Sequence, residues 1–506
     1  MSEQGSEQAD TTSAQRAAEE VGAFLDEEFA SRDVPRPAWG VFLGGRLLAG
    51  ENADGIYRIA SMTKSFTAAA VLGLRAGLIP SRDGAPALDL DAPLPRYILA
   101  LRAPEADPGL ARVTVRDALT MASGLPTDDP WADRQEALSR ADFDALLARP
   151  TSSGFAPGAG FAYSNYSYAL LGRLVEELTG RGYREVVAEH VIAPAGLADT
   201  GFSTAEVDAG RIVPGYRFDA SGAPVELPFS APGAFSAIGG LFSTVEDIGA
   251  WMHGFGTALR EHAGCDGWDR VRRDMQQAQR LVDVEGLAAV AGEERPLAVD
   301  SYGYGLHHRF DARFGQLNYH SGGYPGFGSH MRWHPASGAG IVVFANRTYG
   351  PATLLARQGL DRFLEAVLPA RAGAGRPGPG RGDVRPVSAL EPSAKARALP
   401  ARVEALVLDW DDALADELFE DNVDLDQPRA ERRAAWEAVL AATGERAADE
   451  GGAAQGASEG EPEAVWETAA RASWRTAGPT GEREVSITLT PFDTLQQITV
   501  RAVPGR

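Results

Sequence analysis

The 506-residue sequence is poor in lysine and cysteine, with two lysines, Lys64 and Lys395, and one cysteine, Cys265. A single cysteine excludes an intramolecular disulfide framework. The 48 basic residues are outnumbered by 70 acidic ones, and the net charge of -22 argues against partners such as nucleic acid or an anionic membrane surface. No run of about 18 apolar residues is present, so we expect no membrane-spanning helix.

The N-terminal segment MSEQGSEQADTTSAQRAAEE also lacks the basic and apolar regions of a secretory signal. We therefore predict a cytoplasmic protein and expect residues 1–17 to form a disordered tail. The length suggests two domains, and the 44 % of hydrophobic residues is sufficient for a sizeable core.

A segment rich in glycine and proline divides the chain. The first domain is predicted over residues 18–370 and begins with a helix whose apolar residues recur at helical spacing. Residues 371–395 include RAGAGRPGPGRGDVRP, a composition typical of a linker. Residues 396–506 are then a small α+β accessory domain, with a helical first half, two strands at its end and a disordered loop near 444–463.

Several strands are predicted within the first domain. Gly44 and Gly45 separate two strand-like runs and indicate a hairpin. Four more runs follow residue 300, and they are YGYGLHHRF, QLNYHSGG, SHMRWH and GIVVFANR. The last is apolar enough for a central strand. Residues 258–297 are charged and helical in pattern, and we expect an inserted helical segment or cap there.

Ser61 and Lys64 stand three residues apart at the start of the helix-forming run FTAAAVLGLRAGL. Residues three apart share one face of a helix, so the hydroxyl and the amine would lie side by side. Serine needs an adjacent base to become a nucleophile, and lysine can serve when burial lowers its pKa, whereas arginine cannot. A capping serine followed by a surface lysine is the alternative, but lysine is so scarce in this chain that we favour a catalytic pair.

Two later motifs supply matching chemistry. Tyr163 and Asn165 precede a helix. A tyrosine acts as general acid or base when an ammonium group is near, and an asparagine amide suits both a lysine and a substrate amide. His320, Ser321 and Gly322 end a strand-like run, where glycine lets a substrate approach and a backbone N–H can serve an oxyanion hole. Each motif taken alone also fits an ordinary turn.

In this order, S-x-x-K, Y-x-N and H-S-G resemble the motifs of class C β-lactamase and DD-peptidase-like serine hydrolases, a group with esterase and D-aminopeptidase members. The segments VTVRDALTMASGLP, PGAGFAYSNYSYALLGRLVEELTG, GGLFSTVEDIGAWM and HSGGYPGFGSHMRWHP are also similar to that family. The resemblance covers about residues 21–370. It implies an α+β fold, an antiparallel sheet flanked by helices plus an all-helical region, with the site between the two.

The resemblance also implies catalytic roles. Ser61 would be the nucleophile, and Tyr163 would carry protons to and from the leaving group. Lys64 would be the base or its partner, and whether Lys64 or Tyr163 takes the first proton stays open.

The remaining motif residues would bind the substrate. Asn165 would hold Lys64 and a substrate amide, and the backbone N–H groups of Ser61 and Gly323 would form the oxyanion hole. The implied substrate-binding and oxyanion positions are Asn165, His320, Ser321, Gly322 and Gly323.

One departure from the family pattern bears on the substrate. Dedicated β-lactamases of this class carry lysine where His320 stands, and the lysine charge helps to bind a substrate carboxylate, whereas histidine is mostly neutral at pH 7. We therefore predict a serine hydrolase for a small-molecule ester, amide or peptide, with no cofactor. The alternatives are β-lactamase or DD-carboxypeptidase activity, or a non-catalytic binding protein on the same fold. The oligomeric state is open.

A metal enzyme is the alternative from a different chemical class. Five histidines fall within one stretch, and they are His307, His308, His320, His330 and His334. The stretch is strand-like, so His330 and His334 would not share a helical face, and no acidic residue accompanies them at a known ligand spacing. We predict no metal site.

Overall fold

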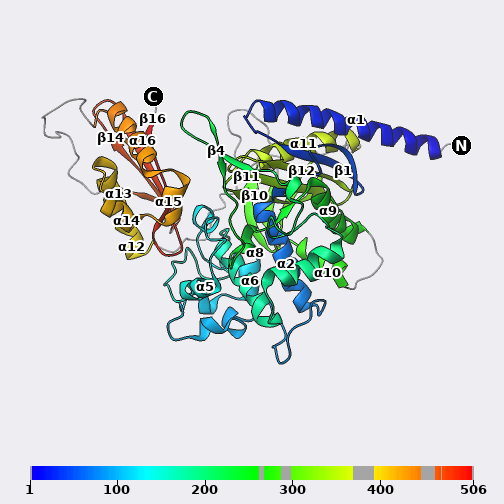
Figure 1. The fold of residues 1–506 in the computed structure, drawn as a ribbon, viewed down its shortest axis with the longest axis horizontal. Helices are drawn as coiled ribbons and strands as arrows, with labels where there is room; N and C mark the ends of the chain where they lie inside the picture. Colours follow the sequence, from blue (N-terminus) through cyan, green and yellow to red (C-terminus); the bar gives the residue numbers. More distant parts are fainter. Residues whose placement is uncertain are drawn as a thin grey trace.

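The computed structural model describes residues 3–260, 267–285, 298–368, 392–445, 462–468 and 470–503. Two units are visible, a larger one up to residue 368 and a smaller one from residue 392 (Figure 1). Most of the predicted linker and most of the predicted loop near 444–463 lie outside the described residues. A short helix, α12 (Ala394–Arg397), begins within the range predicted as linker.

The larger unit is built on an antiparallel sheet. Among the described residues this sheet has eight strands, and all neighbouring pairs are antiparallel. Across the sheet the order is β2 (Arg46–Glu51), β1 (Ala38–Leu43), β12 (Ala339–Ala345), β11 (Phe327–His334), β10 (Gly315–Tyr324), β9 (His307–Asp311), β8 (Ala298–Tyr302) and β7 (Arg280–Glu285). The predicted hairpin at Gly44 and Gly45 joins β1 to β2.

Helices cover both faces of the sheet (Figure 1). On one face lie α1 (Glu3–Ala30) and α11 (Ala352–Val367), and on the other lie α2 (Thr63–Arg75), α9 (Val245–Arg260) and α10 (Gly267–Met275). β12 is buried along its whole length, because its alternate residues serve the two faces. Ile341 and Val343 pack with α1 and α11, and Val342 and Phe344 pack in the cluster that includes α2 and α9.

α1 begins at Glu3, within the range 1–17 that the sequence predicts as a disordered tail. Ala14, Ala17 and Ala18 are buried in the cluster that α1 forms with the sheet and α11. These small side chains let the helix lie close to the sheet, so tertiary packing supports the helix from Ala14 onward.

Residues 258–297 also differ from the predicted helical insertion. α9 ends at Arg260 and α10 is a helix, but β7 pairs with β8 and forms one edge of the sheet. The alternation of RLVDVE along β7 fits a strand at an edge. Residues 261–266 and 286–297 lie outside the described residues.

The predicted helical region lies beside α2. Its helices are α3 (Val115–Leu119), α4 (Asp129–Ala132), α5 (Arg140–Leu146), α6 (Asn165–Thr179), α7 (Tyr183–Val187) and α8 (Ser236–Gly239). Two small sheets join it, β3 (Tyr57–Arg58) with β6 (Phe242–Ser243), and β4 (Gly215–Phe218) with β5 (Pro224–Leu227). α6 starts at the capping hydroxyl of Ser164 and ends at Gly180, whose φ of 71° is one that glycine adopts freely. Within the described ranges, no helix has the length and apolar character that crossing a bilayer requires.

Over its described residues, the smaller unit packs helices against a four-stranded antiparallel sheet. Its helices after α12 are α13 (Leu399–Leu408), α14 (Asp412–Leu418), α15 (Asp421–Asp426) and α16 (Arg429–Ala442), and its strands are β13 (Val465–Thr468), β14 (Arg471–Ala477), β15 (Glu482–Leu489) and β16 (Leu495–Val503). The two predicted strands correspond to β15 and β16. β13 and β14 were not predicted, although they contain β-favouring residues such as Trp466 and Trp474, because alanines interrupt the pattern.

The turn between β15 and β16 joins the two units. It carries Phe492 into the core of the larger unit, where the ring meets Trp131 of α4 edge to face, with 5.6 Å between centroids. Gln496 Nε2 donates to the backbone oxygen of Thr127 at 2.7 Å. The smaller unit therefore supports the segment around α4.

Candidate active site

Ser61 lies where the chain passes from β3 into α2. A tight turn, Ala60–Met62, precedes the helix, and Ala60 adopts a φ of 48°. A non-glycine residue in this left-handed region is strained, and the surrounding structure must impose it. Gly322 of β10 packs on the turn, because a Cβ there would lie only 2.4 Å from the carbonyl oxygen of Ile59. The sheet therefore fixes the position of Ser61.

Lys64 lies one turn along on the same face, as the spacing predicts. Its Nζ donates to Ser61 Oγ at 2.8 Å and to the backbone oxygen of Ile238 at 2.8 Å. Lys64 is fully buried, and this burial lowers the pKa of its amine to about 8, although nearby aspartates, Asp129 first, act in the opposite direction. A base is most effective when its pKa lies near the working pH, so this amine suits proton transfer from Ser61.

Tyr163 stands beside the pair, with Lys64 Nζ 5.0 Å from the centre of its ring. Burial raises the pKa of the Tyr163 phenol well above its usual value, Asp129 raises it further, and a hydrogen bond with Ser61 acts against both. The phenol is therefore protonated in the resting site. The two pKa directions favour Lys64 as the first proton acceptor and Tyr163 as a proton donor.

Asn165 is the first residue of α6, and its contacts differ from those that the resemblance implied. Its Nδ2 donates to Asp129 Oδ1 at 2.6 Å, and its backbone N–H donates to Asp128 Oδ1 at 2.7 Å. None of the hydrogen bonds found among the described residues joins Asn165 to Lys64. The side-chain oxygen of Asn165, Oδ1, is buried without a protein partner, so it is an acceptor that a substrate N–H can use.

Three aspartates in and beside α4 form one side of the site, which we call the acidic wall: Asp128, Asp129 and Asp133. Asp128 accepts from the first backbone N–H groups of α6. Burial is the main cause of a raised pKa for each of them, and the pKa of Asp128 rises to about 7. Motif spacing did not single them out, although three acids within DDPWAD, directly after SGLPT, are a visible signal.

The opposite side of the site is β10. β9 pairs with β10 only as far as Tyr319, so among the described strands residues 320–324 have β11 as their one neighbour. A strand segment with one unpaired edge offers backbone groups to a ligand. The backbone N–H of Gly323 belongs to this segment, where the resemblance places half of the oxyanion hole.

Three histidines accompany this segment, and we call them the histidine wall: the half-buried His307 and the buried His320 and His330. Burial lowers the pKa of each, and that of His320 falls to about 3. His320 Nδ1 lies 2.6 Å from the backbone oxygen of Ser321, and Ser321 Oγ lies 2.9 Å from His330 Nδ1. His320 is therefore neutral and lacks the charge that a lysine would bring.

Within the described residues, four of the five histidines of the metal alternative, all except His307, make a hydrogen-bond contact with another residue. His308 Nδ1 lies 2.8 Å from Asn318 Oδ1, and His334 Nδ1 lies 2.8 Å from Ser337 Oγ. In the part of the chain that the structure describes, no three side chains of histidine, cysteine, aspartate or glutamate are grouped as metal ligands.

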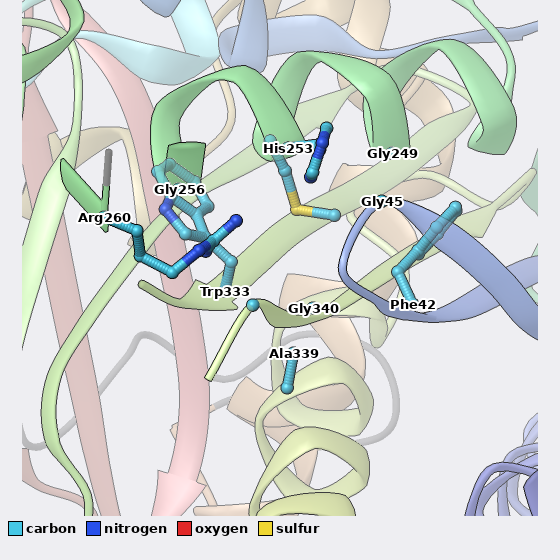
Figure 2. Close-up of a pocket in the computed structure, with 11 residues that line it drawn as sticks. Phe42, Gly45, Gly249, His253, Gly256, Arg260, Trp333, Ala339 and Gly340 are labelled. Carbon is cyan, nitrogen blue, oxygen red and sulfur yellow. The ribbon is translucent and has the colours of Figure 1, made fainter. Parts of the chain in front are cut away.

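A surface pocket lies away from these residues. Figure 2 shows it between α9 and the turn that joins β11 to β12, with His253, Arg260 and Trp333 among its lining. None of the predicted catalytic residues lines it, so it is separate from the Ser61 site.

Known proteins are similar in sequence to the larger unit. A family model described as Beta-lactamase matches residues 21–364. Protein flp of Staphylococcus aureus strain MW2 is 24 % identical over 301 residues, which cover 57 % of this chain and 52 % of that protein. A D-aminopeptidase of Cereibacter sphaeroides is 27 % identical over 244 residues, 46 % of this chain and 42 % of the relative. The chain thus spans about half the length of these curated relatives.

Solved structures share the fold. The octameric penicillin-binding protein homologue from Pyrococcus abyssi superposes with a TM-score of 0.56 at 23 % identity, over 68 % of this chain and 77 % of that one. A class C beta lactamase gives a TM-score of 0.53 at 14 % identity, over 70 % of this chain and 98 % of that one. Both confirm the predicted sheet flanked by helices. Since the family model spans nearly the whole larger unit, the chain belongs to the beta-lactamase family.

Proposed function

We propose that the chain is a serine hydrolase that cleaves a small ester or amide through an acyl-enzyme on Ser61. The observation that carries this proposal is the 2.8 Å contact between Lys64 Nζ and Ser61 Oγ. A surface lysine beside a capping serine would be solvated, with a pKa near its usual value. Here the amine is fully buried and burial lowers its pKa to about 8.

In the proposed acylation, Ser61 Oγ attacks the substrate carbonyl while Lys64 takes the hydroxyl proton. The backbone N–H groups of Ser61 and Gly323 receive the developing oxyanion. Tyr163 gives its proton to the leaving group as the scissile bond breaks, and Lys64 then returns a proton to Tyr163. The proton of Ser61 has in effect moved to the leaving group, and both helper groups are restored.

Deacylation follows the same route with water as the nucleophile. Lys64 accepts a proton from the water as its oxygen attacks the acyl carbonyl. The bond to Ser61 Oγ then breaks, and Lys64 returns the proton to Ser61. The product acid leaves, and the site is ready for another cycle.

The charge of the two walls bears on the substrate. His320 is neutral, so the β10 side offers no cation at the position where the family's β-lactamases carry lysine. The acidic wall on the other side offers no cation to an anionic substrate group either. We therefore propose a neutral ester or amide in preference to a carboxylate-bearing β-lactam, and similarity to a D-aminopeptidase adds D-amino-acid amides to the substrates worth testing.

Labelling with a fluorophosphonate probe tests the nucleophile. Wild-type protein should be labelled, and Ser61→Ala should not. Turnover of p-nitrophenyl acetate, D-alanine p-nitroanilide and nitrocefin then tests the substrate class, with nitrocefin expected to have the lowest kcat/KM. An unlabelled wild type would favour a binding protein on the same fold, and nitrocefin as the best substrate would favour a β-lactamase.

A further inference from the structure

Tyr349 is an unusual residue in the loop that joins β12 to α11. Its backbone adopts a φ of 48°, although it is not glycine, and its side chain remains 47 % exposed. The loop itself is fixed, because the backbone of Gly350 packs so closely on Gly328 that a Cβ there would lie 2.7 Å from Gly350 N. The N–H of Tyr349 also donates to the backbone oxygen of Phe327 at 3.2 Å. The surroundings thus hold a strained backbone that places one tyrosine ring.

That ring reaches from one side of the site to the other. At the β10 end it lies against Gly323, where a Cβ would be 2.5 Å from Tyr349 Cδ1. At the far end its hydroxyl donates to Asp133 Oδ2 of the acidic wall at 3.0 Å. Asp133 is 3 % exposed, and its charge acts on Lys64. Tyr349 therefore bridges the two walls next to the glycine whose N–H belongs to the proposed oxyanion hole.

The bridge lies on the acyl side of Ser61. Tyr163, the proposed donor to the leaving group, has its ring centre 6.2 Å from that of His320. Gly323 is three residues further along β10, a distance of about 10 Å in an extended strand. A leaving group that takes its proton from Tyr163 points toward the His320 end, so the acyl group extends toward Gly323, Tyr349 and Asp133.

We propose that Tyr349 is a specificity-determining residue that closes the acyl side of the site and restricts it to short acyl groups. This inference rests on the proposed acyl-enzyme at Ser61. A short acyl chain fits beneath the bridge between Gly323 and Asp133. A long chain must displace the ring and break its hydrogen bond to Asp133, which lowers kcat/KM for that substrate.

A chain-length series of p-nitrophenyl acetate, butyrate and octanoate tests the proposal. The most informative variant is Tyr349→Gly, because glycine adopts a φ of 48° without strain while the ring is lost. We expect the octanoate-to-acetate ratio of kcat/KM to rise at least tenfold in Tyr349→Gly. It should rise less in Tyr349→Phe, which keeps the ring but loses the bond to Asp133. Leu354→Ala is the matched control, because Leu354 is a similarly exposed apolar side chain (48 %) in the adjacent helix α11.

Fluorophosphonate labelling separates the two proposals. If wild type is labelled at Ser61 and the ratio is unchanged in a folded Tyr349→Gly, the role of Tyr349 is overturned and the proposed hydrolase stands. The same holds if Leu354→Ala shifts the ratio equally. If wild type is neither labelled nor active, the proposed acyl-enzyme on Ser61 is wrong, and the inference about Tyr349 is overturned with it. The ratio of labelling rates with long-chain and short-chain alkyl fluorophosphonates provides a second measure of the chain-length preference.

Discussion

The two walls of the site bury ionisable groups of opposite kind. The acidic wall holds three aspartates whose pKa values burial raises, and the histidine wall holds three imidazoles whose pKa values burial lowers. Burial therefore favours the neutral form on both sides of Lys64. The aspartate charge that remains favours the protonated amine, whereas the histidine wall adds no positive charge. The pKa of Lys64 is about 8 because burial lowers it more than the charge of the aspartates raises it.

The walls also differ in what supports them. The histidine wall lies on β9, β10 and β11 of the main sheet, so the pairing of these strands fixes its position. The acidic wall lies on the short helix α4, which Phe492 and Gln496 of the smaller unit hold in place. One wall thus depends on the larger unit alone, and the other depends on both units.

Substitution of Lys64, which lies between the walls, should have the largest effect on activity. Lys64→Arg keeps the charge and Lys64→Met keeps much of the volume, but neither retains an amine that can accept a proton near neutral pH. We expect each to lower kcat/KM for p-nitrophenyl acetate by about 10³-fold, within the range for loss of a general base. Because the site is fully buried, the larger arginine should also destabilise the fold by about 1–3 kcal/mol. Near-normal turnover in Lys64→Met would contradict the proton role, and thermal unfolding measures the second effect.

Phe492→Ala tests the dependence of the acidic wall on the smaller unit. The ring is 5 % exposed and lies among Trp131, Tyr166 and the guanidinium of Arg149. Its removal should lower the free energy of unfolding by about 3 kcal/mol. It should also lower kcat, because α4 loses its support.

The matched control for Phe492 is Phe419→Ala, whose ring contacts are with Trp410 and Arg432 inside the smaller unit. Denaturant unfolding and kcat are measured for both variants, and Phe492→Leu should recover part of both losses. An equal fall in kcat for Phe419→Ala would mean that general loss of stability, and not the contact with α4, explains the result.

Gly322→Ala tests the support of the histidine wall. The added methyl group would lie 2.2 Å from Ser329 Oγ and 2.4 Å from the carbonyl oxygen of Ile59, so β10 must move away from the Ser61 turn. A shift of about 1 Å in a catalytic group costs roughly 10²-fold in rate, which is the loss of kcat we expect. Gly182→Ala is the control, since no atom lies within 4 Å of a Cβ there. Equal kcat values for the two variants would show that the close contact has no catalytic role.

The sequence predicted one of these walls better than the other. Spacing alone placed Lys64 on the face of Ser61, and the Gly322 motif indicated a strand at the site. The roles of Tyr163 and Asn165 came from the resemblance. The acidic wall was missed because its effect depends on burial beneath a second unit, and the contact of Phe492 spans more than 300 residues. Local pattern cannot show such contacts, nor that Ala14, Ala17 and Ala18 would be buried in the cluster beside the sheet.

The walls should also respond in opposite ways to pH. His320 has a folded pKa of about 3, below the usual 6.5, so the unfolded chain binds the proton first and stability falls as pH falls below 6.5. From pH 7 to pH 5 this one group accounts for about 2 kcal/mol. Asp128 has a folded pKa of about 7, above the usual 3.8, so its stabilising contribution exists below pH 3.8 and is lost as pH rises toward 7.

Unfolding free energies from pH 4 to pH 8 measure these two slopes. His320→Gln should reduce the loss of stability on the acid side. Asp128→Asn, which keeps one of the two oxygens that accept from the first N–H groups of α6, should reduce the loss between pH 4 and pH 7. A His320→Gln profile parallel to that of wild type would mean that folding leaves the pKa of His320 at its usual value, and the lowered pKa proposed for this wall would be wrong.

His320→Lys should have the smallest effect of these variants, and we expect it to change the preference between substrates. A cation on the histidine wall gives a carboxylate-bearing substrate a partner that the wild-type site lacks. The neighbouring Lys64 and the burial of the position both oppose the new charge, so the gain is modest. We expect the ratio of kcat/KM for nitrocefin to that for p-nitrophenyl acetate to rise about tenfold, equivalent to roughly 1.4 kcal/mol. His320→Gln is the neutral control, and an equal rise in that variant would show that space, and not charge, sets the preference of this wall.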